Sequence, residues 1–350
     1  MTVSSFRPIL FAAAILCGAM ATADATTGAP DHRETCRTMA ASYDEVIASC
    51  SALIASDSEQ GRDLAMAYAH RGDILQLKND LTRAMADLDE AIRIDPTFAT
   101  PYVTRGIVWA RSGNPDRALV DYDRAIELDP GMVLAYYNRA HAWKRKGDYP
   151  RAIADFTRTL EMRPDVAAFH AARANVYEDM RDFEHAIADY SEEIRLAPTD
   201  INALLKRGGV YRDAKDFSHA LADFDTMVKL APQDPRSWRS RGLVRMMMQD
   251  LDGAIGDFTK SLEIDPQNLS AYVNRGGAYS LSNQRDRALA DYDKAIKLAP
   301  TYPLSYVGRG DALRAKGDRN GARAMYRKAL SLEPNFPPAM NALQKLGMKS

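Results

Sequence analysis

Arginine and aspartate recur along this chain in near lockstep. Eight arginines lie 34 residues apart, and an aspartate follows seven of them after a further 16 residues. Because the flat guanidinium group can hold a carboxylate with two hydrogen bonds, this spacing predicts a repeated ion pair between two neighbouring elements. A basic ladder that grips an acidic ligand is the alternative, but a ligand-reading surface should vary between copies, so the structural interpretation is favoured. The residues are Arg71, Arg105, Arg139, Arg173, Arg207, Arg241, Arg275 and Arg309, with Asp87, Asp121, Asp155, Asp189, Asp223, Asp257 and Asp291, and Met325 breaks the aspartate series.

The remaining reactive side chains lack the spacing of a catalytic or metal site. The six histidines do not combine with cysteine or acid as metal ligands, and the sequence has neither a glycine-rich phosphate loop nor a nucleophile elbow. The adjacent carboxylates Glu192 and Glu193 lie on a predicted solvent face. The formal net charge of −1 argues against nucleic acid, because its readers are strongly basic. We therefore expect no enzyme activity, no catalytic residue, no cofactor, no metal and no nucleic-acid partner.

The elements that position these residues follow from a periodic proline. A proline recurs every 34 residues from Pro96 to Pro334, without insertion or deletion. A fixed period of this length marks one supersecondary unit copied in tandem. The sequence therefore predicts eight repeats, at residues 65–98, 99–132, 133–166, 167–200, 201–234, 235–268, 269–302 and 303–336.

Each repeat has the pattern of two helices. When every repeat is numbered from 1 to 34, position 8 is glycine or alanine and position 20 is alanine throughout. Small residues there let two helices approach closely. The stripes at positions 4, 8 and 11 and at 20, 24 and 28 predict helices over about positions 1–14 and 18–31. The proline at position 32 ends the second helix, and Thr97, Asp165 and Thr199 are predicted to cap the helices that follow.

Over residues 65–334 this pattern resembles the tetratricopeptide repeat, a helix–turn–helix unit. The resemblance implies an all-α fold, a right-handed superhelix (solenoid) of eight helix–turn–helix repeats. First helices would line a concave groove, and second helices would face outward. One departure is that the family usually has leucine at position 7, where this chain always has arginine.

The ends of the chain differ from the repeats. Arg7, the apolar run from Ile9 to Met20 and the sequence Ala21-Thr22-Ala23 predict a signal peptide over residues 1–23. No other segment is long and apolar enough to cross a membrane. We therefore expect an exported protein, periplasmic or secreted.

Two cysteines remain after cleavage, Cys36 and Cys50. An even pair in an exported chain favours a disulfide over two free thiols. Residues 24–64 are predicted to form an N-terminal capping segment around this pair. The stretch from Cys36 to Cys50, leading into the segment Leu64–Gly72, also resembles the start of exported bacterial tetratricopeptide proteins. Residues 337–350 are predicted to form a C-terminal capping helix.

In the tetratricopeptide family, positions 2, 5, 6, 9, 12 and 13 line the groove. Repeats 5 and 6 are basic at these positions, with Arg245 nearby and three methionines directly after it. A methionine run beside basic side chains is an adaptable apolar surface, which favours a peptide with acidic and apolar residues, or a free C-terminal carboxylate. An ordinary charged surface is the alternative, since 27% of the chain is charged. The candidate partner-binding residues are Lys206, Arg212, Arg236, Arg239 and Met246, with Tyr137, His141 and Lys144 in repeat 3.

The expected function is a non-enzymatic protein–protein interaction scaffold that binds a peptide or protein segment in the concave groove. One alternative is an accessory or regulatory subunit of an envelope enzyme complex that acts on cell wall or polysaccharide. Another is a glycan or small-ligand binding module, which groove aromatics such as Tyr137 would favour. Self-association is left open.

Overall fold

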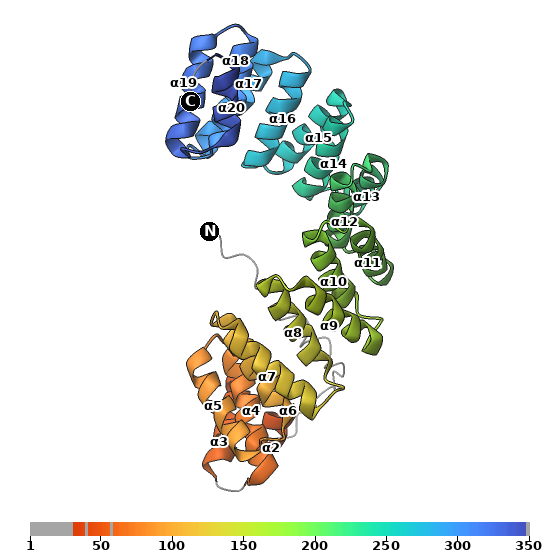
Figure 1. The fold of residues 1–350 in the computed structure, drawn as a ribbon, viewed down its shortest axis with the longest axis vertical. Coiled ribbons are helices and arrows are strands. Elements are labelled where there is room, and N and C mark those ends of the chain that lie inside the picture. Colours follow the sequence, from red (N-terminus) through yellow and green to blue (C-terminus); the bar gives the residue numbers. More distant parts are fainter. Residues whose placement is uncertain (1–30, 39–40, 57–58, 348–350) are drawn as a thin grey trace. The chain divides into compact units, whose positions relative to one another are not determined.

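The computed structural model describes residues 31–38, 41–56 and 59–347, so the predicted signal peptide lies outside the described residues. Every regular element in these ranges is an α-helix (Figure 1), which confirms the predicted all-α solenoid of helix–turn–helix repeats. Within the described part of the chain, no helix is both long and apolar enough to span a bilayer. The chain divides into two compact units after Asp182, and each is described by itself.

The N-terminal unit begins with two helices that precede the repeats. The pair α4 and α5 forms repeat 1, and each following pair forms one further repeat. The bounds in this unit are α2 (His32–Thr38), α3 (Tyr43–Ala55), α4 (Gly61–Leu77), α5 (Leu81–Ile94), α6 (Ala99–Arg111), α7 (Pro115–Leu128), α8 (Val133–Lys146), α9 (Tyr149–Met162) and α10 (Ala167–Asp179).

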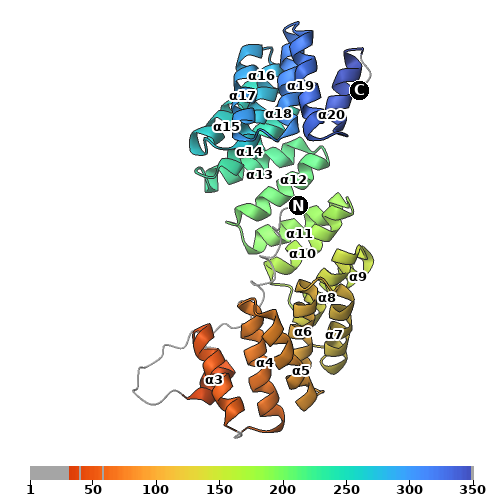
Figure 2. The same ribbon diagram turned by 90° about the vertical axis from the view of Figure 1, so that its left-hand side faces the viewer.

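The C-terminal unit contains repeats 5 to 8, the second helix of repeat 4 and a last short helix. Within each unit, the helix pairs lie side by side in chain order (Figure 2). The bounds in this unit are α11 (Phe183–Leu196), α12 (Ile201–Asp213), α13 (Phe217–Leu230), α14 (Pro235–Met247), α15 (Leu251–Ile264), α16 (Leu269–Leu281), α17 (Arg285–Leu298), α18 (Pro303–Ala315), α19 (Arg319–Leu332) and α20 (Pro337–Lys345).

The turn between the two helices of a repeat has a fixed conformation. Position 15 is left-handed in all eight repeats, with φ between 60° and 90°. An aspartate at position 16 then caps the second helix in five repeats, as where Asp216 accepts a hydrogen bond from the backbone nitrogen of His219 at 3.2 Å. Helix α12 thus ends and α13 begins within three residues, which sets the two helices antiparallel.

The predicted caps of the first helices are wrong. The predicted caps are Thr97, Asp165 and Thr199. In each case the N-cap is the next residue, which is Phe98 for α6, Val166 for α10 and Asp200 for α12. Thr97 instead donates its backbone N–H and its hydroxyl to Asp95 Oδ1, at 2.9 and 2.6 Å. The tight turn after the proline uses the threonine, so the next residue starts the helix.

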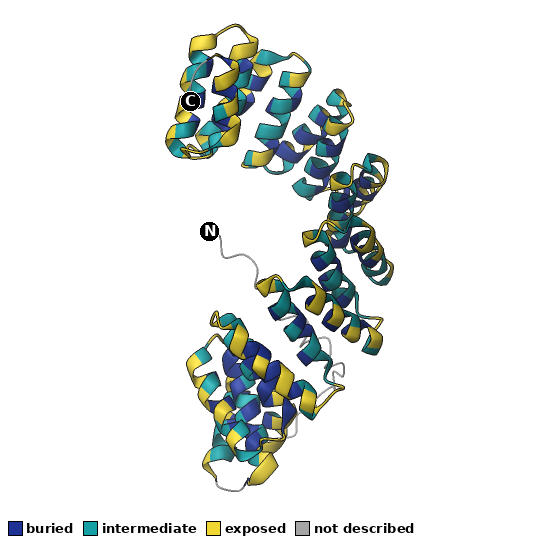
Figure 3. Cartoon of the chain, viewed as in Figure 1, coloured by how far each residue is buried: buried dark blue, intermediate teal, exposed yellow. Residues whose placement is uncertain are grey.

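Within each unit, the core lies between neighbouring helices (Figure 3). The aromatic residues at position 24 are buried, and they cover the small residue at position 8 of the first helix. A Cβ atom on Gly208 would lie 2.7 Å from Cε1 of Phe224, so glycine is required for this close approach. The same pairing of a glycine with a large ring recurs where Tyr122 covers Gly106, Phe258 covers Gly242 and Tyr326 covers Gly310, whereas Leu88 takes the place of the ring in repeat 1.

The N-terminal capping segment is joined by the predicted disulfide. Cys36 of α2 and Cys50 of α3 are bonded, and both are buried against Val46, Ala67 and Ile74. At the other end, α20 covers repeat 8, where Ala339, Leu343 and Leu346 pack on Tyr326. Both ends of the repeat array therefore bury apolar surface that no further repeat covers.

Candidate functional site

The repeated arginine and aspartate form the predicted ion pairs. In each pair that the structure describes, Nε and Nη2 donate to the two carboxylate oxygens at 2.6–3.0 Å. Hydrogen bonding to the aspartate raises the pKa of the arginine, and burial opposes it. The aspartates are only 3–6% exposed, so the pairs belong to the packing between helices and are not free to grip a ligand. They are Arg71–Asp87, Arg105–Asp121, Arg139–Asp155, Arg207–Asp223, Arg241–Asp257 and Arg275–Asp291.

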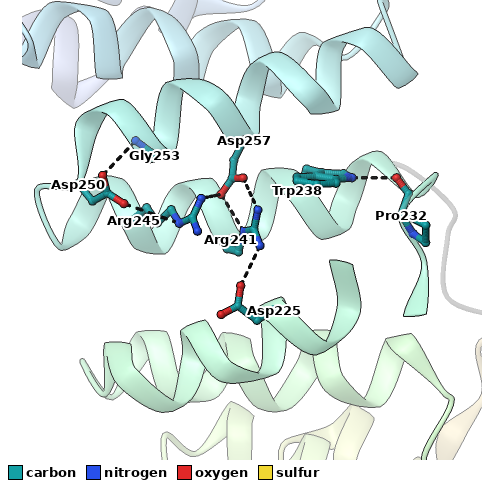
Figure 4. Close-up of polar contacts among 8 residues, drawn as sticks. All are labelled: Asp225, Pro232, Trp238, Arg241, Arg245, Asp250, Gly253 and Asp257. Carbon is teal, nitrogen blue, oxygen red and sulfur yellow. Dashed lines mark hydrogen bonds and ion pairs between the residues drawn. The ribbon is translucent and has the colours of Figure 1, made fainter. Parts of the chain in front are cut away.

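A third contact from the same arginines was not predicted. Nη1 of Arg241 donates to Asp225 Oδ1 of the preceding repeat at 2.8 Å (Figure 4). The acceptor occupies position 25, where repeats 1 to 7 always carry aspartate, serine or threonine. Arg105, Arg139, Arg207, Arg241 and Arg275 therefore each join two repeats as well as the two helices of their own repeat. The other acceptors at position 25 are Asp89, Asp123, Thr157, Ser191, Thr259 and Asp293.

In several repeats the bulky residue at position 4 ties the first helix to the turn before it. Trp238 donates from Nε1 to the carbonyl oxygen of Pro232 at 2.9 Å (Figure 4), and Tyr306 donates to that of Pro300 at the same distance. The Trp238 ring also lies under the Arg241 guanidinium, 5.0 Å from the ring centroid. These residues are therefore part of the scaffold.

Tyr137 and His141 are not available to a partner, contrary to their prediction as binding residues. Tyr137 is 3% exposed and packs on Phe156 and Phe169. His141 lies edge-on to Tyr137 and to Phe156, and its Nε2 is buried without a hydrogen-bond partner. Burial lowers the pKa of His141 to about 4, aided by the charges of Lys144 and Arg145. Tyr137 therefore belongs to the core, where Phe169 of the next repeat packs on it, and His141 is half-buried beside it.

Lys144, the third predicted residue of repeat 3, is engaged within the N-terminal unit. Its Nζ lies 3.1 Å from Asp179 Oδ2 and donates to the carbonyl oxygen of Asn175 at 3.3 Å. Repeat 3 therefore presents an internal contact where the sequence predicted a ligand surface.

The structure brings together three of the predicted basic residues in repeats 5 and 6. We call Arg212, Arg236 and Arg239 the basic cluster. The positive charges of Arg236 and Arg212 both lower the pKa of Arg239, after the larger effect of burial. Arg236 is held by Asp234 at 2.7 Å and Arg212 by Asp213 at 2.7 Å. Arg239 differs, because its Nε is buried and donates to no described residue.

The position of Arg239 explains why its Nε lacks an acceptor. It occupies position 5, where the other seven repeats carry alanine, valine, leucine or tyrosine. Ala69, Val103 and Val307 at this position are at most 5% exposed. Arg239 therefore places a guanidinium group at a position that is filled by a buried apolar side chain in repeats 1, 2 and 8. The sequence signal for this site is that Arg239 is the one charged residue at position 5 of the eight repeats.

Lys206 lies beside a carboxylate that the sequence interpretation misplaced. Glu193 was predicted on a solvent face, but Glu193 Oε2 is buried without a hydrogen-bond partner. Burial raises the pKa of Glu193 to about 7, with a further contribution from Asp200, and the charge of Lys206 opposes it. Glu193 occupies position 27, where every other repeat has a fully buried neutral residue.

The methionine run is split between the core and the surface. Met246 packs against Ala254 and Phe258, so it contributes mainly to the core. Met247 and Met248 are 45% and 46% exposed, and Leu281 of repeat 7 is 58% exposed. Arg245, expected near the groove, instead donates to Asp257 Oδ2 at 3.0 Å (Figure 4).

A hollow of about 170 Å³ lies between the disulfide-bonded segment and α4. Its polar lining is partly used within the chain, because Arg33 pairs with Glu59 and His70 donates from Nδ1 to the carbonyl oxygen of Cys36. Among the described residues, no group of three histidine, cysteine or acidic side chains is arranged to hold a metal ion.

Comparison with known proteins agrees with this architecture. Sequence profiles described as tetratricopeptide repeat match residues 65–98, 133–166, 208–275, 269–302 and 304–336, which together are more than half of the chain. No curated protein gives a significant match.

Two solved structures are similar in fold. A tetratricopeptide repeat protein from Parabacteroides merdae ATCC 43184 has a TM-score of 0.57 and 20% identity, over 70% of this chain and 97% of that one. The Cut9–Hcn1 hetero-tetramer of APC/C has a TM-score of 0.50 and 17% identity, and the match covers 86% of this chain but 59% of that one. With its repeated helix pairs and the profile matches, the chain belongs to the tetratricopeptide repeat family.

Proposed function

We propose that this protein is an exported, non-enzymatic scaffold that binds an acidic segment of a partner protein on the first helices of repeats 5 and 6. The family supports the general role, because a tetratricopeptide fold suggests a protein–protein interaction scaffold. The specific site rests on the basic cluster.

The observation that carries the proposal is the buried Nε of Arg239, which has no hydrogen-bond acceptor among the described residues. The two neighbouring arginines are each paired with a carboxylate, whereas Asp234 only partly offsets the charge of Arg239 and is itself bonded to Arg236. A buried donor without an acceptor costs free energy, and a bound carboxylate would remove that cost. A charge-assisted hydrogen bond contributes about 1.5–3 kcal/mol, which is enough to select an acidic partner.

Two features support export. Residues 1–23 have the pattern of a signal peptide, and the Cys36–Cys50 disulfide is typical of proteins that fold in an oxidising compartment. Fractionation of cells that produce the full chain, followed by mass spectrometry of its N-terminus, tests this part. Recovery of a protein that still starts at Met1 in the cytoplasmic fraction would contradict the prediction of export.

The binding site can be tested by crosslinking in intact cells. A photoreactive amino acid replaces Asn274, which occupies groove position 6 of α16 in the repeat that follows the basic cluster. A second version of the protein carries the photoreactive amino acid at Lys297 on the outward helix α17. We expect a crosslinked partner only from Asn274, and we expect Arg239→Glu to reduce that product at least tenfold. The control reverses two charges away from the cluster, Lys294→Glu with Lys297→Glu, and should leave the product unchanged.

Equal crosslinking in the Arg239→Glu variant, with an unchanged melting temperature, would remove the basic cluster from consideration. The mass of the crosslinked partner also separates the alternatives. An enzyme of cell-wall or polysaccharide metabolism would assign the protein as an accessory subunit, and a second copy of this chain would show self-association.

A further inference from the structure

We infer that the partner segment is extended and is recognised at two points, a carboxylate at Arg239 and, about four residues away, an apolar side chain at Met247 and Leu281. This inference rests on the proposed function and specifies the chemistry of the partner. The two points lie in the C-terminal unit, on α14 and on the neighbouring first helix α16.

The apolar point consists of large side chains that the fold does not bury. Met247, Met248 and Leu281 are each about half exposed, and we call these three residues the apolar edge. Met247 and Leu281 occupy position 13 of successive repeats, so they project from equivalent places on adjacent first helices. Exposed clusters of this kind mark contact surfaces more often than isolated apolar residues do.

Position 13 has another use in repeats 2 and 3. Arg111 donates from Nη1 to the carbonyl oxygen of Gln76 at 2.5 Å, and Arg145 donates to that of Ala110 at 3.0 Å. Those arginines satisfy carbonyl groups at the end of the preceding first helix. Repeats 6 and 7 lack this contact, and they expose Met247 and Leu281 at the same position. The exposure of these two apolar side chains does not contribute to the stability of the fold.

The inner face of α14 changes from basic to apolar along its length. Arg236 and Arg239 lie near its start and Met247 lies at its end, and at 100° per residue the three share an arc of about 80°. Arg239 and Met247 are separated by about 12 Å along the helix axis. An extended peptide covers that distance in about four residues. The partner should therefore carry an acidic residue and an apolar residue at this spacing.

An extended protein segment fits this surface better than a second folded surface. The basic cluster has one buried guanidinium nitrogen, Arg239 Nε, that lacks an acceptor among the described residues, and the apolar edge consists of only three half-exposed side chains, so the surface offers few contact points. Charge complementarity thus selects an acidic segment, and the apolar edge selects its neighbour. Together the two contacts give specificity that neither gives alone.

A displayed library of random 12-residue peptides, selected on the intact protein, tests this inference. We expect enrichment of an acidic and an apolar residue about four positions apart. A synthetic peptide with the enriched sequence should then lose about tenfold in affinity when its acidic residue becomes the amide, and about tenfold when its apolar residue becomes serine.

Two protein variants assign the contacts. Arg239→Gln should abolish the preference for the acidic residue and keep that for the apolar one, whereas Met247→Gln with Leu281→Gln should do the reverse. If only the arginine variant changes the selection, the proposed function stands and the two-point inference fails. No enrichment, an enriched pattern that both variants leave unchanged, or a shift from dimer to monomer in the methionine–leucine variant would also overturn it.

Discussion

Arg241 holds Asp257 with two hydrogen bonds, from Nε to Oδ2 at 3.0 Å and from Nη2 to Oδ1 at 2.6 Å. The same guanidinium group reaches Asp225 of the preceding repeat (Figure 4). The Asp257 side chain is 3% exposed and that of Asp225 is 40% exposed. One arginine therefore makes a buried contact within its repeat and a half-exposed contact between repeats.

These two contacts should differ in their contribution to stability. Asp257→Ala leaves buried cations without a partner and should cost about 3–5 kcal/mol of unfolding free energy. Asp225→Ala removes a solvent-screened contact and should cost at most about 1 kcal/mol. Urea denaturation of the two variants measures the difference. Equal losses would mean that the contact between repeats is as important as the contact within one.

The same logic predicts that removing both partners is less damaging than removing one. Asp223→Ala leaves the Arg207 guanidinium group between two helices without its carboxylate partner. The double variant with Arg207→Ala no longer buries a charge, so it should recover part of the lost stability. The exposed pair Arg93 and Glu90 is the matched control, and its single variants should cost at most about 1 kcal/mol. A double variant that is less stable than Asp223→Ala would contradict the prediction.

Acid should destabilise the protein through His141. Burial lowers the pKa of His141 to about 4 from its ordinary value of 6.5. A histidine with a lowered pKa contributes its full stability above pH 6.5, and this contribution is lost as the pH falls toward 4, because the unfolded chain binds the proton more readily. The loss should reach about 3 kcal/mol, from 1.36 kcal/mol per pKa unit.

His141→Phe should therefore flatten the decline of the melting temperature between pH 6.5 and 4. The same replacement at the exposed His219 serves as the control. An unchanged pH profile in His141→Phe would show that His141 is not the group responsible.

A glycine in the turn of repeat 5 should stabilise the protein. Lys215 has a φ of 64°, a left-handed conformation that costs an L-residue about 1–2 kcal/mol and glycine almost nothing. Lys215→Gly should therefore raise the unfolding free energy by up to about 1 kcal/mol, despite the greater entropy of glycine in the unfolded chain. Ala222→Gly, at an exposed position in the interior of α13, should lower it by about 1 kcal/mol. Thermal denaturation distinguishes the two, and a loss in both variants would refute the prediction.

The repeat architecture could be read from the sequence because its determinants are local and recur. A proline every 34 residues ends the second helix, and stripes at helical spacing define the buried face of each helix. The pairing of Arg207 with Asp223 follows from repeated chemistry, since two opposite charges in every copy must serve the same contact. The Cys36–Cys50 disulfide could be predicted because Cys36 and Cys50 are the two cysteines that remain after the predicted cleavage.

The candidate site depended on which side chains the neighbouring repeats cover, and this is a property of the tertiary structure. Tyr137 and Arg239 share position 5, yet Phe169 closes over Tyr137, whereas Arg239 has a buried nitrogen without an acceptor. Met246 and Met247 are adjacent in sequence, but one packs against Phe258 and the other is half exposed. Sequence alone determined the period and the helices, because these follow from backbone geometry. Only the packing of one repeat on the next decided which charges and apolar side chains remain uncompensated, because burial is set by atoms far away along the chain.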